Sequence, residues 1–114
     1  MYGPKEEKKV PEEALEVATL AANIISKYIQ RLYNYRSEYG ITSGIIPLNE
    51  DGRKDNPIKA INDIFLTTNY KFTCLIRTTL ELVFKLHPHS LKSISVERNK
   101  DPRKTISAIR IDIY

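Results

Sequence analysis

Basic side chains gather near the C-terminal end of the sequence, where their type and spacing suit phosphate binding. Four of them fall within seven residues: Arg98, Lys100, Arg103 and Lys104. Each could replace condensed counterions at a nucleic-acid phosphate, which gives binding that weakens as salt rises. The alternative is a solvated turn, because turns are polar and lysines on exposed strands discourage unwanted pairing. We therefore predict that these four residues contact DNA or RNA, with the solvated turn as the alternative.

A second set of residues combines aromatic rings with positive charge. It consists of Tyr28, Tyr33, Tyr35 and Tyr39, interleaved with Arg31 and Arg36. Bases stack on aromatic rings, so this set could bind a single strand. Three of the tyrosines, however, share one face of a helix, which favours packing at a core edge or in a dimer interface. We predict a homodimer whose interface includes Ile25, Tyr28, Ile29 and Tyr35.

Groups that could support catalysis or bind a metal are sparse. His87 and His89 have no cysteine or third histidine near them in the sequence, and two ligands rarely make a metal site. Cys74 would need a histidine base held beside it to act as a nucleophile, and we expect a small buried residue instead. The sequence holds no Walker loop, dinucleotide fingerprint or metalloprotease motif. We expect no enzymatic activity, no cofactor and no bound metal.

The charge balance differs between the two halves of the chain. Residues 58–114 carry 10 basic and 5 acidic side chains, whereas residues 1–57 carry 8 basic and 9 acidic ones. A net charge of +5 on the second half is compatible with a nucleic-acid surface. The low methionine and glutamine content hints at a thermophilic source, although seven asparagines point the other way.

Length and composition are those of one globular domain. We expect it to span residues 11–114, after a flexible charged tail of residues 1–10. That tail lacks the apolar core of a signal peptide, and the longest apolar runs are only a few residues, so we expect no membrane span. Cys74 is the single cysteine, which excludes an intrachain disulfide and favours the reducing cytoplasm.

Residues 11–56 predict a long helix followed by irregular chain. Pro11 and two carboxylates mark a helix start, and Gly40 is placed to end the helix near Glu38. An apolar stripe at helical spacing runs through Leu15, Ala18, Ala22, Ile25, Ile29 and Leu32. Further apolar residues widen it, so the helix would lie between a sheet and either another helix or a second subunit. A short strand is expected at Ile45-Ile46, and a short helix is expected to start at Asn56-Pro57.

Residues 58–86 allow two interpretations. Apolar residues follow a helical period throughout, yet the run Ile64-Phe65-Leu66-Thr67-Thr68 is β-branched and aromatic, as strands are. We prefer a strand over Asp63–Thr68, a turn at Asn69-Tyr70 and a helix over Lys71–Leu86, which Pro88 ends. One long helix is the alternative.

Residues 91–114 predict a β-hairpin. Ile94 and Val96 are two residues apart, as are Ile109, Ile111 and Ile113, which is the period of half-buried strands. A loop over Asp101–Lys104 would place Val96 opposite Ile109 and Ile94 opposite Ile111. Ile106 and Ala108 would then fall on the outer face, where a partner chain could cover them. The whole chain thus predicts an α+β fold of two layers, in which a long N-terminal helix and a second helix pack on a small, mostly antiparallel sheet ending in the hairpin.

The segment from Asn62 to Tyr114 resembles the second half of the Alba-type chromatin proteins of archaea. In the resemblance, NDIFLTTN is a strand, KFTCLIRTTLELVFKL a helix and LKSISVERNKDPRKTISAIRIDIY a long hairpin. The resemblance implies a dimer that inserts a basic hairpin arm into a groove of the nucleic acid. Its groove contacts would be Arg98, Lys100, Arg103 and Lys104.

Two functions from different classes are therefore open. The first is a small, non-enzymatic nucleic-acid-binding protein that uses the hairpin arm on phosphates and a groove. The second is a structural or adaptor subunit, of viral or mobile-element origin, that docks on itself or on a protein partner through the helix of residues 11–38.

Overall fold

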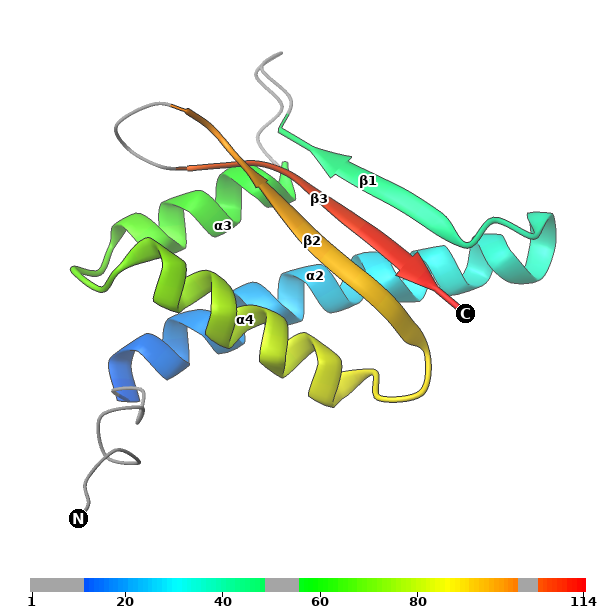
Figure 1. Ribbon diagram of the computed structural model, residues 1–114, viewed down its shortest axis with the longest axis horizontal. Helices are drawn as coiled ribbons and strands as arrows, with labels where there is room; N and C mark the ends of the chain where they lie inside the picture. The colour runs from blue at the N-terminus through cyan, green and yellow to red at the C-terminus, as the bar shows by residue number, and fades with distance from the viewer. Residues whose placement is uncertain (1–11, 49–55, 101–104) are drawn as a thin grey trace.

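A computed structural model describes residues 12–48, 56–100 and 105–114 of the chain. Within these ranges, three helices lie against one face of a three-stranded antiparallel sheet, which confirms the predicted α+β fold (Figure 1). The chain order is helix α2, strand β1, helices α3 and α4, and strands β2 and β3. The expectations for the tail of residues 1–10 and for the turn Asp101–Lys104 lie outside the described residues.

Helix α2 covers Glu12–Tyr39, as the apolar stripe predicts. Its first turn carries two carboxylates, which suit the positive end of the helix dipole. Its buried residues are Ala14, Ala18, Ala21, Ala22, Ile25, Ile29 and Leu32. Gly40 ends the helix at a φ of 73°, a left-handed conformation that glycine adopts without strain, and its N–H donates to the Arg36 carbonyl at 2.9 Å.

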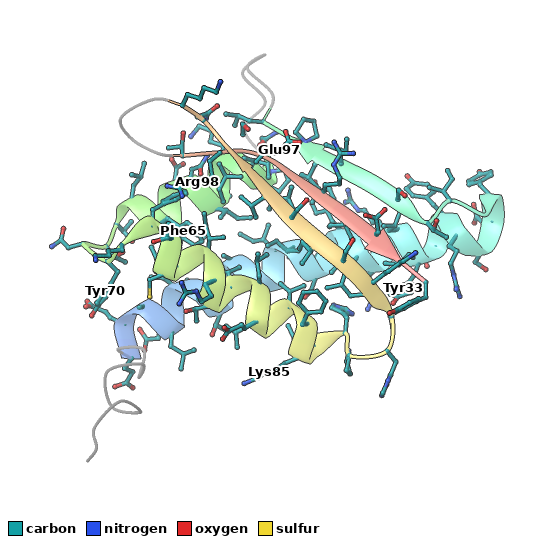
Figure 2. The ribbon with its side chains drawn as sticks, viewed as in Figure 1. Tyr33, Phe65, Tyr70, Lys85, Glu97 and Arg98 are labelled. Atoms are coloured by element: carbon teal, nitrogen blue, oxygen red, sulfur yellow. The ribbon has the colours of Figure 1, made fainter. Side chains whose placement is uncertain are left out.

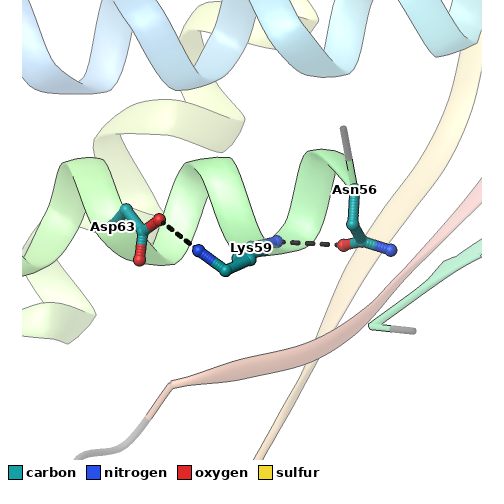
Figure 3. Close-up of polar contacts among 3 residues, drawn as sticks. All are labelled: Asn56, Lys59 and Asp63. Carbon is teal, nitrogen blue, oxygen red and sulfur yellow. Dashed lines mark hydrogen bonds and ion pairs between the residues drawn. The ribbon is translucent and has the colours of Figure 1, made fainter. Parts of the chain in front are cut away.

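Helix α3, Pro57–Leu66, starts where the Asn-Pro pair predicts. The Asn56 side-chain oxygen accepts from the Lys59 N–H at 3.0 Å, which satisfies a free donor of the first turn (Figure 3). The Asn56 amide also donates to the Pro47 carbonyl at 3.1 Å, so the cap fastens α3 to the end of β1. One turn further on, Lys59 Nζ pairs with Asp63 at 3.0 Å.

The strand predicted over Asp63–Thr68 is wrong, and so is the alternative of one long helix. Residues 63–66 continue α3, because Ile58, Ile61 and Phe65 form a buried helical stripe that overrides the β-branched preference of the run. The helix stops at Thr67, whose N–H and hydroxyl both donate to the Ile64 carbonyl, at 3.2 and 2.6 Å. The second helix of the prediction is confirmed as α4, Phe72–Leu86.

The sheet consists of β1 (Ser43–Pro47), β2 (Leu91–Arg98) and β3 (Ile106–Ile113), in the order β1-β3-β2. The predicted hairpin register is confirmed, with Val96 opposite Ile109 and Ile94 opposite Ile111. The short strand expected at Ile45-Ile46 is confirmed as β1, which pairs with the other side of β3. The last strand of the chain is therefore the central one.

Ile106 does not lie on the outer face, so that prediction is wrong. The register shifts beside Glu97, so that Glu97 opposes Ala108 while Arg98 opposes Ile106. This irregularity reverses the alternation of side chains between the two faces of the sheet. The Ile106 side chain therefore points into the core, where it is 2% exposed. The Asn62 side chain completes the arrangement by accepting from the Ile106 N–H at 2.8 Å and donating to its carbonyl at 3.0 Å. Ala108 keeps its outer position but is covered within the chain, between its neighbours on β1 and β2.

Candidate nucleic-acid interface and apolar groove

A basic surface forms where the end of β2 meets the start of α4. The Arg98 guanidinium lies 5.2 Å from the centre of the Phe72 ring, a cation–π distance, on the hairpin side of the helices (Figure 2). Lys71 precedes Phe72, and Lys100 follows Arg98 by two residues; all three cations are exposed. We call Lys71, Arg98 and Lys100 the basic corner. The other two predicted contacts, Arg103 and Lys104, lie outside the described residues.

The basic corner is anchored from both sides. Phe72 packs edge-on against the buried Phe65 ring, with ring centres 5.5 Å apart. On the hairpin side, the Asn99 N–H donates to the Thr105 carbonyl at 2.7 Å, and the two side chains are bonded at 2.9 Å. Arg98 is thus held between a fixed ring and a fixed strand end, and its charge stays at the surface.

The start of α4 adds hydrogen-bond donors to the basic corner. The N-cap residue is Lys71, whose side chain makes no capping bond, and the first turn contains no acidic residue. The first N–H groups of a helix have no partner within the helix and carry the positive end of its dipole. The start of α4 therefore offers backbone donors beside Lys71 and near the stacked Arg98. Donors together with positive charge are suited to phosphate oxygens.

The outer face of the sheet has a different character. Asp112 accepts from the hydroxyls of Ser43 at 2.7 Å and Ser93 at 3.0 Å, across all three strands. These bonds, Ser43 first, lower the pKa of Asp112 below its ordinary value, and nearby Lys92 and Arg110 add to the effect. Arg110 pairs with Glu97 at 3.5 Å. Charges on this face are balanced, so it does not extend the basic corner.

The tyrosines and arginines of α2 form ring–cation pairs. Arg31 lies 5.1 Å from the centre of the Tyr28 ring and Arg36 lies 5.9 Å from that of Tyr33. Arg36 also donates to the Tyr114 carbonyl at 2.7 Å, which ties the helix to the end of β3. These arginines already contact the protein's own rings, which agrees with packing rather than with a base-stacking platform.

An apolar groove of about 270 Å³ lies between the C-terminal half of α2 and β1. Two of the predicted interface residues, Tyr28 and Tyr35, line it, together with Ile41 and Ile45. The other two, Ile25 and Ile29, are buried in the chain's own core at 2% and 0% exposure, and are unavailable to a partner. The structure thus divides the predicted interface between core and groove.

Sequence reasoning missed Lys71 and Phe72 in the basic corner. It predicted the short strand at Ile45-Ile46 but not that this strand forms the edge of the sheet beside the groove. The signal for these two residues was a lysine and a phenylalanine at the start of the helix expected over Lys71–Leu86. The signal for the edge position was weak, because five residues between a helix and a polar loop rarely identify an edge strand.

The histidines and Cys74 show no metal-binding geometry. Groups of three or more His, Cys, Asp or Glu residues that could hold a metal are absent from the described part of the chain. His87 caps the end of α4 and is 8% exposed, and burial lowers its pKa below the ordinary 6.5. Its Nε2 is buried without a hydrogen-bond partner in the described structure. Cys74 is half-buried.

Among the described helices, none has the length and apolar character that crossing a membrane requires. Comparisons with protein-family models, with curated proteins and with solved structures found no match.

Proposed function

We propose that the chain is a small, non-enzymatic nucleic-acid-binding protein that contacts phosphates through the basic corner. The observation that carries this proposal is the position of Arg98, stacked on Phe72 beside the uncapped start of α4. A stacked guanidinium keeps its hydrogen-bond donors directed outward, where they can meet a phosphate oxygen.

The basic corner suits binding that depends on the nucleic-acid backbone rather than on base sequence. Lys71, Lys100 and the first N–H groups of α4 offer charge and donors that suit phosphate oxygens. Arg103 and Lys104 follow Lys100 in the sequence. The proposal that this arm enters a groove comes from the resemblance to Alba-type proteins, whose expected strand NDIFLTTN falls mostly in helix α3 here.

The proposal is tested by measuring affinity for short duplex DNA, single-stranded DNA and RNA by fluorescence anisotropy over a salt series. The triple variant Lys71→Gln, Arg98→Gln and Lys100→Gln should bind more weakly. It should also lower the slope of log affinity against log salt by about 2–3, since each phosphate contact contributes about 0.7–0.9.

The matched control removes three exposed cations elsewhere: Lys27→Gln, Lys59→Gln and Lys85→Gln. Lys85 lies at the far end of α4, about 21 Å from Lys71 at 1.5 Å per helical residue. The control should retain the parental slope. Absence of binding at low salt, or equal losses in both variants, would contradict the proposal.

A structural or adaptor subunit is the second candidate, and the apolar groove favours it. Exposed aromatic and branched side chains beside a sheet edge that is unpaired among the described residues are typical of protein interfaces. Stable self-assembly without any salt-sensitive polynucleotide binding would select this candidate over the first.

A further inference from the structure

Strand β1 has one unpaired edge in the described structure. It bonds to β3 on one side, and no strand among the residues described pairs with the other. The Leu48 N–H donates to the Ser107 carbonyl, and the Ile113 N–H donates to the Thr42 carbonyl. Hydrogen-bonded pairs alternate along an antiparallel ladder, so Gly44 and Ile46 also bond to β3. Ser43 and Ile45 therefore direct their N–H and C=O groups toward the free edge.

The free edge is short and has a defined end. Pro47, the next residue with outward backbone groups, has no N–H, and its carbonyl already accepts from Asn56 at 3.1 Å. Only Ser43 and Ile45 within β1 can therefore both donate and accept across this edge. Beyond Ile45, the described part of β1 therefore offers an added strand no residue that both donates and accepts.

Apolar surface borders the same edge. Four large side chains are exposed there: Tyr35 at 52%, Tyr39 at 67%, Ile41 at 45% and Ile45 at 53%. With roughly 200 Å² for a fully exposed side chain of this size, they present about 400 Å² on one chain. Two such patches give about 800 Å² before the strand backbone and Arg31 are counted, which approaches the ~1,000 Å² that a specific interface needs.

We infer that a second copy of this chain docks here, by antiparallel pairing of β1 with its own symmetry mate. In the register that we propose, Ser43 of each copy opposes Ile45 of the other, and the two-fold axis passes through Gly44. Each Ser43–Ile45 pair exchanges two hydrogen bonds, and the two three-stranded sheets become one continuous sheet. The exposed tyrosines of the two α2 helices approach each other beneath it.

Several features fit a second copy better than an unrelated peptide or a nucleic acid. A two-fold axis generates an antiparallel pair, in which the outward N–H and C=O groups of Ser43 meet those of Ile45 in the other copy. Gly44 lies at the non-bonded position, where backbones approach most closely and a side chain would crowd the axis. The groove contains Arg31 as its one charged lining residue, and that guanidinium is stacked on Tyr28.

This inference does not depend on nucleic-acid binding, and it names the occupant of the groove for the second candidate function. Sedimentation velocity of the full chain should show a monomer–dimer equilibrium at concentrations up to about 100 μM. Ile45→Lys and Tyr35→Lys should each shift it toward monomer at least tenfold. The control Leu66→Lys changes a side chain of matched exposure, 54%, at the end of α3, and should leave the equilibrium unchanged.

Amide hydrogen exchange tests the register. The amides of Ser43 and Ile45 should exchange fast in dilute samples and become protected as the dimer forms, whereas those of Gly44 and Ile46 should be protected in both states. A chain that stays monomeric overturns the inference, even if it binds nucleic acid. A dimer in which Ser43 and Ile45 remain unprotected, or one that Ile45→Lys leaves intact, overturns the strand pairing.

Discussion

The basic corner and the apolar groove lie toward opposite ends of the molecule's long dimension, and they are built in different ways (Figure 1). The corner consists of long charged side chains, one of them stacked on a ring, around a helix start. The groove consists of half-exposed apolar side chains beside a strand edge. Under the two proposals, contacts at the corner would be screened by salt, whereas association at the groove would depend on buried area and backbone bonds. One small chain thus presents two surfaces that respond to different conditions.

The largest expected change in stability distinguishes a core residue of α2 from a groove residue on the same helix. Ile29→Ala should lower the free energy of unfolding by about 2–5 kcal/mol, because its side chain is fully buried in the core. Tyr35→Ala, two turns further along α2, should change it by no more than about 0.5 kcal/mol in dilute solution. Urea denaturation of the two variants measures the difference. Equal losses would mean that Tyr35 belongs to the core and that the groove is not a surface.

A smaller loss of stability is expected from a change beside the basic corner. It should leave amide protection at the groove unchanged. Asn62→Leu removes the side chain that bonds both backbone groups of Ile106, leaving these groups buried without partners. We expect a loss of about 1–3 kcal/mol and faster amide exchange at Ile106. Asn23→Leu, an exposed position on α2, is the control. Faster amide exchange in β1 rather than at the hairpin end would contradict this expectation. It would mean that the basic corner and the groove are structurally coupled.

The smallest expected effect on stability comes from the hydrogen bond between Asp112 and Ser43, which holds β1 to β3. Because the folded-state pKa of Asp112 lies below its ordinary value of 3.8, its bonds stabilise the fold fully above that pH. The contribution is lost as pH falls through the lower folded-state pKa. Thermal melts from neutral to acidic pH measure this loss of stability. Asp112→Asn should lack the part of the acid-induced fall in melting temperature that Asp112 causes, whereas Asp63→Asn should keep it. Identical profiles for the two variants would show that Asp112 does not fasten β1.

The sequence predicts correctly those parts of the fold in which apolar residues repeat with a single period, either helical or strand-like. The stripe of α2 and the facing pairs Val96–Ile109 and Ile94–Ile111 have a single arrangement that buries their apolar sides. Residues 63–68 were misassigned because their β-branched composition conflicts with a helical stripe that begins outside them, at Ile58. Only the cap at Asn56 and the packing of Phe65 decide between the two.

The candidate sites were less accessible to sequence reasoning, because they depend on contacts between distant residues. Arg98 was recognised as a cation, but its stacking on Phe72 requires the register shift at Glu97 and the position of α4. The same shift moved Ile106 inward, which strand alternation alone cannot foresee. Similarly, the tyrosine spacing indicated a shared face, but only the fold separates the groove residue Tyr35 from the core residue Ile29.

The central position of β3 sets the order in which the protein can be assembled on the ribosome. Ser43 meets Asp112 across 69 residues of sequence, and β1 and β2 touch only through β3. Neither strand has a partner until the final strand is synthesised and has left the exit tunnel, so the sheet forms late and through distant contacts. Until then, the apolar face of α2 and both edges of the nascent strands stay unprotected. Folding of this chain is therefore expected to be slow for its length and sensitive to aggregation during synthesis.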